Sequence, residues 1–157
     1  MMCPPSGLET NPASSQAFRL RLVYRLDELN RLATWIETVA SQLSLTERAK
    51  FRLEMVLTEA VTNVIQHGSE GAGDREIRLV LEQAGDDVRM EVRDGGRPFD
   101  PLEQPRVVFP RTLDEASQGG LGIHLIRSYS DECSYRHEGG ENVLTLIIRD
   151  AKLQRED

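Results

Sequence analysis

The sequence predicts a single α+β domain in which a mixed, mostly antiparallel sheet carries its helices on one face. Two stretches, 27–43 and 44–67, place apolar residues at the spacing of an amphipathic helix. Two pairs of alternating stretches are joined by short turns at 84–87 and 138–140, as in β-hairpins. The order strand, helix, helix, strand, strand, helix, strand, strand then predicts a two-layer α/β sandwich.

The composition limits the classes of function. The chain has 157 residues and a formal net charge of -7, which argues against a general nucleic-acid binder because such proteins present a basic face. No run of about 18 apolar residues occurs, so no membrane span is expected. Cys3 and Cys133 lack the spacing of metal ligands or of a disulfide framework. Residues 1–16 lack the features of a secretory signal, so we expect a cytoplasmic location.

The first elements follow in order along the chain. Residues 1–16 are rich in Pro, Ser and Gly, which predicts a flexible tail. One domain is expected over 17–150, followed by a charged and frayed end over 151–157. Phe18–Tyr24 alternates apolar and basic residues, which is typical of a half-buried strand, and the helix over 27–43 follows it.

The second helix carries signals for its start and its end. Ser44 is the predicted N-cap, Glu47 completes a capping box three positions later, and Gly68 ends the helix. The remaining strands are expected at 75–82, 88–94, 132–137 and 142–149.

Three polar residues form a row on the second helix, beside its apolar stripe. Glu59, Asn63 and His67 follow one another at intervals of four, so they look sideways into a cleft. A carboxylate can accept a proton from a hydroxyl group, and an amide oxygen can ligate Mg²⁺. A solvated Glu and a surface Asn are the alternative for the first two residues. We expect His67 to interact with the helix C-terminus instead of the cleft.

Asp94 stands out because it continues the apolar phase of its strand. Val88, Met90 and Val92 face one way, and Asp94 follows them on the same side. A buried carboxylate is costly unless it finds a donor. The exocyclic amine of adenine is such a donor, and Gly96 lets the backbone approach a base closely. An ordinary Asp-Gly turn remains an equal alternative.

A glycine loop precedes the third predicted helix, which begins near residue 123. Gly119, Gly120 and Gly122, with Leu121 between them, can direct backbone N–H groups and a helix N-terminus towards phosphate. The segment 95–117 before it is long and aperiodic, as functional lids often are. Its arginines either assist in neutralising phosphate or remain solvated: Arg97, Arg106 and Arg111. The three motifs in this order predict a Mg-nucleotide site.

These motifs resemble the Bergerat-type (GHKL) ATPase superfamily shared by gyrase, histidine kinases and mismatch-repair ATPases. The resembling segments are Leu57–Gly68, Arg93–Pro101 and Gly119–Ile126. The chain is most similar to one branch, the anti-sigma-factor serine/threonine kinases of bacterial partner-switching systems, over residues 18–150. The resemblance implies the Bergerat ATP-binding fold and a homodimer. It also implies ATP and Mg²⁺ as cofactors, a STAS-type antagonist as substrate, and a sigma factor as the other partner.

The resemblance also assigns roles to individual residues. Glu59 is implied as the general base, Asn63 as the Mg²⁺ ligand and Asp94 as the residue that reads adenine. Gly96 belongs to the first glycine box, and the phosphates would be held by Gly119, Gly120, Leu121 and Gly122. Two positions depart from the family pattern: Pro98 replaces a glycine, and Asn142 is nearest to a threonine of the adenine site. A non-catalytic ATP-binding module that controls a partner by association is the alternative function.

Overall fold

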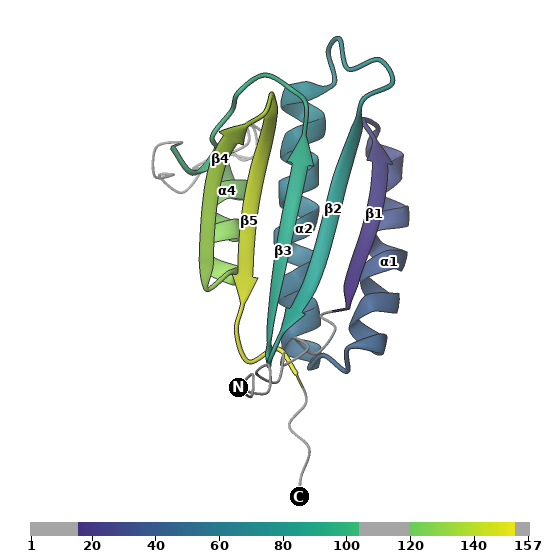
Figure 1. Cartoon of the computed structure of the whole chain (residues 1–157), viewed down its shortest axis with the longest axis vertical. Helices are drawn as coiled ribbons and strands as arrows, with labels where there is room; N and C mark the ends of the chain where they lie inside the picture. Colours follow the sequence, from purple (N-terminus) through teal and green to yellow (C-terminus); the bar gives the residue numbers. More distant parts are fainter. Residues whose placement is uncertain (1–15, 104–119, 153–157) are drawn as a thin grey trace, which may run out of the picture.

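The computed structural model describes residues 16–103 and 120–152. Its elements are β1 (Ala17–Val23), η1 (Leu26–Glu28), α1 (Leu29–Gln42), α2 (Glu47–Gly68), β2 (Glu76–Ala84), β3 (Asp87–Asp94), η2 (Pro101–Glu103), α4 (Gly120–Tyr129), β4 (Glu132–Glu138) and β5 (Glu141–Ile148). In this part of the chain five strands form one antiparallel sheet in the order β1-β2-β3-β5-β4. The helices α1, α2 and α4 lie together on one face of the sheet (Figure 1). The predicted α+β class is confirmed.

The core fills the space between these helices and the sheet. Ile36 of α1, Leu53 and Leu57 of α2, and Leu79 and Met90 of the sheet are each 1% exposed or less. Burying a side chain of this size contributes about 1.5–3 kcal/mol. The packing fixes α2 against the sheet, so that polar residues in its C-terminal half are held beside the end of β3.

The start of α2 differs from the prediction. Thr46, not Ser44, is the N-cap, and its hydroxyl accepts a hydrogen bond from the N–H of Ala49 at 3.0 Å. Ser44 adopts a left-handed conformation with φ of 52°, and Leu45 forms a β-bridge with Lys152. The bridge places the helix start two residues after the predicted one.

The domain continues past the predicted boundary at residue 150. Ala151 is fully buried, its N–H donates to the carbonyl of Asp86 at 2.8 Å, and its carbonyl accepts from the N–H of Thr46 at 2.9 Å. The prediction of a frayed end from residue 151 is therefore wrong for Ala151 and Lys152, because these residues tie the end of the sheet to the start of α2. Residues 153–157 lie outside the described part of the chain.

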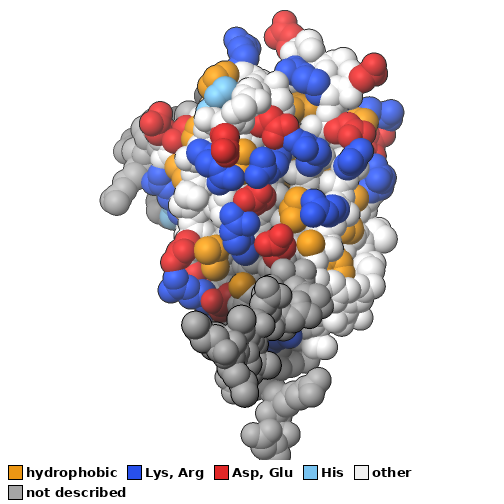
Figure 2. Space-filling view, viewed as in Figure 1, with side chains coloured by type: hydrophobic (Ala, Val, Ile, Leu, Met, Phe, Trp, Pro, Cys, Tyr) orange, Lys and Arg blue, Asp and Glu red, His pale blue; other side chains and the backbone are white. Residues whose placement is uncertain are grey.

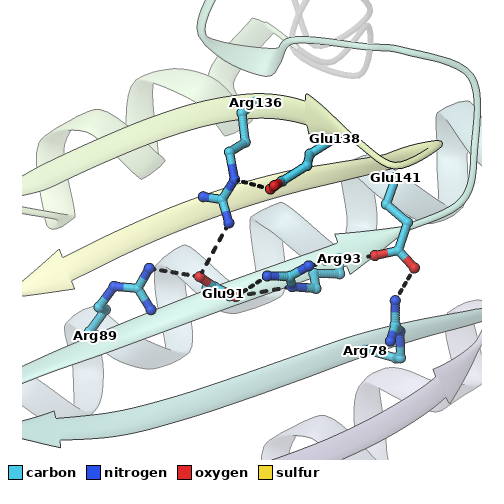
Figure 3. Close-up of polar contacts among 7 residues, drawn as sticks. All are labelled: Arg78, Arg89, Glu91, Arg93, Arg136, Glu138 and Glu141. Carbon is cyan, nitrogen blue, oxygen red and sulfur yellow. Dashed lines mark hydrogen bonds and ion pairs between the residues drawn. The ribbon is translucent and has the colours of Figure 1, made fainter.

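The face of the sheet that the helices leave open is charged. Figure 2 shows basic and acidic side chains interleaved over it. Glu91 is 9% exposed and lies among the guanidinium groups of Arg89, Arg93 and Arg136 (Figure 3). Burial raises the pKa of Glu91, but the hydrogen bonds from Arg89 and Arg93 outweigh it, and the pKa is lowered overall.

No helix in the two described ranges is both long and apolar enough to span a lipid bilayer.

Candidate nucleotide site

A pocket opens where the C-terminal half of α2 meets the adjoining ends of β3 and β5. The empty space within it, counted together with the part open to solvent, is about 500 Å³. The segment that leads from β3 into η2 forms one wall. The residues that line it are Ala60, Asn63, Val64, His67, Gly68, Val92, Asp94, Gly96, Arg97, Phe99, Pro101, Ile126, Tyr135, Asn142 and Leu144. Four of the residues expected from the sequence therefore meet in one place: Asn63, Asp94, Gly96 and Asn142.

Asp94 is buried, as its strand phase predicts, with 8% of its surface exposed. Its Oδ1 accepts hydrogen bonds from the N–H of Gly96 at 2.9 Å and from Nδ2 of Asn142 at 3.1 Å. The bond to Gly96 is the local one of an Asp-Gly turn. The structure therefore shows the Asp-Gly turn and, in the same residue, a buried carboxylate in a pocket; that this carboxylate reads a base stays a prediction.

Gly96 is required by a close approach within the chain. A Cβ at this position would lie 2.8 Å from Oδ1 of Asp94 and 3.7 Å from the Cα of Gly68. The carboxylate is held by two hydrogen bonds, so it has little freedom to move away. What approaches the glycine in this structure is the carboxylate of Asp94, where the sequence predicted a base.

Asn63 faces the pocket with an unsatisfied amide. It is 7% exposed, and its Nδ2 has no hydrogen-bond partner among the described residues. A buried donor without a partner costs about 1–3 kcal/mol, so a ligand that supplies one is favoured. The atom without a partner is the donor Nδ2, which fits a phosphate oxygen; the oxygen of the same amide is the atom of the type that ligates Mg²⁺.

Glu59 lies one helical turn before Asn63 on α2. It is not among the residues that line the pocket in the described part of the chain. Its side chain is partly buried, and this burial raises the pKa of the carboxyl. A raised pKa makes an ionised carboxylate a stronger base, which suits proton acceptance from a hydroxyl group.

His67 lies at the pocket and not merely at the helix end. Its ring stacks on Phe99, with centroids 4.3 Å apart and an interplanar angle of 20°. The expectation that His67 does not face the cleft is therefore wrong, although His67 does lie in the last turn of α2. Of the predicted row, Asn63 and His67 line the pocket and Glu59 does not. Phe99 and Tyr135 were not predicted from the sequence; an aromatic residue soon after Asp94-Gly-Gly96 was the available signal for Phe99.

Tyr24 packs against Gly68 and lies near the carboxylate of Asp94. A Cβ at Gly68 would lie 2.9 Å from its ring, so Gly68 is needed for this contact. Arg75 lies 5.9 Å from the centroid of the same ring and donates to the carbonyl of Gly95 at 2.6 Å. Burial, followed by the charge of Asp94, raises the pKa of Tyr24 to about 12. The phenol therefore remains neutral beside the carboxylate.

Only part of the second glycine motif, residues 120–122, lies within the described part of the chain. Gly120, Leu121 and Gly122 form the first turn of α4, so the helix starts three residues earlier than predicted. Backbone N–H groups in a first helical turn have no partner within the helix, so they remain available to an anion. Gly119 and the lid arginines Arg106 and Arg111 lie outside the described residues. Arg97 lines the pocket.

Comparisons with known proteins agree with this geometry. Residues 22–148 match the model of the histidine kinase-like ATPase domain. The serine/threonine-protein kinase BtrW of Bordetella bronchiseptica is 31% identical over 74% of this chain and 82% of its own length. An anti-sigma F factor of Anoxybacillus flavithermus is 27% identical over 73% of this chain and 78% of its own length.

A solved structure shows the same fold. It contains the RsbU and RsbW domains of Rv1364c from Mycobacterium tuberculosis, and it matches 90% of this chain with a TM-score of 0.63 at 17% identity. The present chain spans 35% of that longer chain. The chain therefore belongs to the family of histidine kinase-like (GHKL-type) ATPase domains, and the predicted resemblance to its serine/threonine kinase branch is confirmed.

Proposed function

We propose that this chain is a Mg-ATP-dependent protein serine/threonine kinase that acts as an anti-sigma factor in a partner-switching system. Its substrate is a STAS-type antagonist, and its other partner is a sigma factor or a similar regulator. The kinase and anti-sigma names of the relatives support this function. The observation that carries it is the pairing, in one pocket, of the buried carboxylate of Asp94 with the unsatisfied buried amide of Asn63.

Each residue of the site has a distinct task in this proposal. Asp94 accepts a hydrogen bond from the exocyclic amine of adenine. Guanine has no amine at the corresponding carbon, so it would not provide this hydrogen bond. Asn63 holds Mg²⁺ through its amide oxygen, which adds no charge to the site. The first turn of α4 offers N–H groups to the phosphates. ATP, when bound, supplies the phosphoryl group.

Glu59 is the general base of the proposed reaction. It accepts the proton of the serine or threonine hydroxyl as the oxygen of that group becomes the nucleophile. The carboxyl is partly exposed and lies one helical turn from Asn63, so a protein substrate at the mouth of the pocket can reach it. Positioned proton transfer of this kind contributes about 10²–10⁴-fold to a rate.

A regulatory module without catalysis is the second candidate. Such a module needs Asp94 and Asn63 to bind ATP, but it has no need of a base at residue 59. The carboxyl of Glu59, with a pKa raised by burial, favours the enzyme.

A homodimer and a cytoplasmic location belong to the same proposal. The charged open face of the sheet and the outer edge of β1 are the surfaces that a second copy could cover. Cross-linking and sedimentation would test the dimer.

Phosphoryl transfer tests the proposed activity directly. The purified protein is incubated with Mg²⁺, radiolabelled ATP and a candidate STAS-type antagonist from the same organism. We expect label on a serine or threonine of that protein, and we expect Glu59→Gln to remove the labelling while ATP binding persists. Tight ATP binding by the wild type without any labelling would favour the regulatory module instead.

A further inference from the structure

We propose that Asn142 is a positioning residue of the nucleotide site, which fixes Asp94 and the wall of the pocket and does not itself contact the base. This inference rests on the proposed function, because it assigns Asn142 a place in nucleotide binding. It replaces the expectation that Asn142 stands where related proteins present a threonine to adenine.

The amide of Asn142 is saturated by contacts within the chain. An asparagine amide has two N–H donors and an oxygen with two lone pairs. Nδ2 donates to Oδ1 of Asp94 at 3.1 Å and to the carbonyl of Arg97 at 2.9 Å, with a longer contact of 3.4 Å to the carbonyl of Gly96. Oδ1 accepts from the N–H of Phe99 at 3.2 Å and from the hydroxyl of Tyr135. These partners, all within the described residues, leave no donor or acceptor capacity for a base.

The register of the sheet makes Asp94 and Asn142 direct partners in the pairing of β3 with β5. Both side chains are buried on the helix-covered face. Oδ1 of Asp94 is held from one side by Asn142 and from the other by the N–H of Gly96. These two hydrogen bonds engage Oδ1, so Oδ2 is the oxygen that we assign to the ligand, with the phenol of Tyr24 close to the same carboxylate.

The same amide also fastens the wall of the pocket. Arg97 and Phe99 both line the pocket, and Asn142 binds the carbonyl of the first and the N–H of the second. The ring of Phe99 then stacks on His67 of α2. The side chain of Asn142 therefore connects β5 to the carboxylate of Asp94 and also to the pocket wall that contains Arg97 and Phe99. Its loss releases both at once.

The test uses Asn142→Ala, with Thr145→Val as the matched control. Thr145 lies on the same strand but on the opposite face, and its buried hydroxyl has no hydrogen-bond partner among the described residues. Amide hydrogen exchange is measured without nucleotide, and affinity for Mg-ATP is measured by calorimetry. We expect Asn142→Ala to accelerate exchange at the N–H of Phe99, to weaken Mg-ATP binding by about 10- to 100-fold and to change kcat at saturating ATP by less than about 3-fold. Thr145→Val should change none of these quantities.

A double variant separates positioning from direct contact. If Asn142 acts by positioning Asp94 and the wall, Asn142→Ala in the background of Asp94→Asn should cause a clearly smaller loss of affinity than it causes alone, because only the release of the wall remains. If Asn142 contacts the base independently, the two losses multiply and the proposal is overturned. Unchanged exchange at Phe99 together with unchanged affinity in Asn142→Ala would also overturn it.

A second substitution at residue 142 separates the inference from an effect on folding. Should Asn142→Ala not fold, Asn142→Asp retains the acceptor for Phe99, loses the amide donors to Asp94 and to the carbonyl of Arg97, and places a second carboxyl beside Asp94. It should keep the Phe99 amide protected and still bind Mg-ATP weakly. Equal affinities of Asn142→Asp and wild type would contradict the inference. A wild type that binds no nucleotide would refute the proposed function, whereas exchange at Phe99 tests the contacts of Asn142 in either case.

Discussion

The replacement of Asp94 by Asn tests how the pocket recognises its ligand. Asparagine has nearly the same shape, so its oxygen can still accept from the N–H of Gly96 and from Nδ2 of Asn142, which lie 2.9 Å and 3.1 Å from Oδ1. The change places an NH₂ group where Oδ2 was. The amine of a base then meets a donor instead of a carboxylate. A hydrogen bond to a charged group contributes about 1.5–3 kcal/mol, which corresponds to a loss of affinity of about 10- to 150-fold.

Calorimetry with Mg-ATP and Mg-ADP measures this loss, and both nucleotides should lose the same factor because they share the base. Asp86→Asn is the control, since Asp86 is an exposed carboxylate in the turn between β2 and β3. The unfolding temperature without nucleotide should change little, because both internal bonds persist. An affinity of Asp94→Asn within about 3-fold of the wild type would refute the assignment of Asp94 to the base.

Three further variants test the site and the open face of the sheet. Glu59→Gln should raise the unfolding temperature at pH 7, because burial raises the pKa of Glu59 and penalises its charged form; the gain should vanish below the ordinary pKa of a glutamate, where the carboxyl is protonated in both states. Asn63→Ala should weaken binding of Mg-ATP more than binding of ATP in EDTA, as measured by calorimetry, because the lost amide is a metal ligand. Glu91→Gln should cost about 1–3 kcal/mol in urea unfolding at pH 7, since Arg89 and Arg93 lose their charged acceptor. The lowered pKa of Glu91 means that this difference disappears as the pH falls through that pKa.

Local sequence patterns are sufficient to predict the sheet, the helices and the faces on which the candidate site residues of β3 and α2 lie. The alternation of Val88, Met90 and Val92 places Asp94 on the buried face of the sheet, because a strand has a strict period of two. The spacing of Glu59 and Asn63 likewise places them on one side of α2. Both inferences depend on regular geometry within a single element.

These local patterns do not predict contacts between segments that are distant in the sequence. The saturation of Asn142 depends on five partners from β3, β4 and the segment after β3, which only the register of the sheet brings together. The N-cap lies at Thr46 and not at Ser44 because Leu45 pairs with Lys152 at the far end of the chain. The stacking of His67 on Phe99 similarly joins two segments that no periodicity relates.

A crystal structure of the protein with Mg²⁺ and a non-hydrolysable ATP analogue would test the proposed kinase site most directly. We expect the amine of adenine at Oδ2 of Asp94, Mg²⁺ at the amide oxygen of Asn63, and the carboxylate of Glu59 facing the terminal phosphate. A nucleotide bound elsewhere, or a Glu59 carboxylate directed away from that phosphate, would contradict the proposed kinase mechanism.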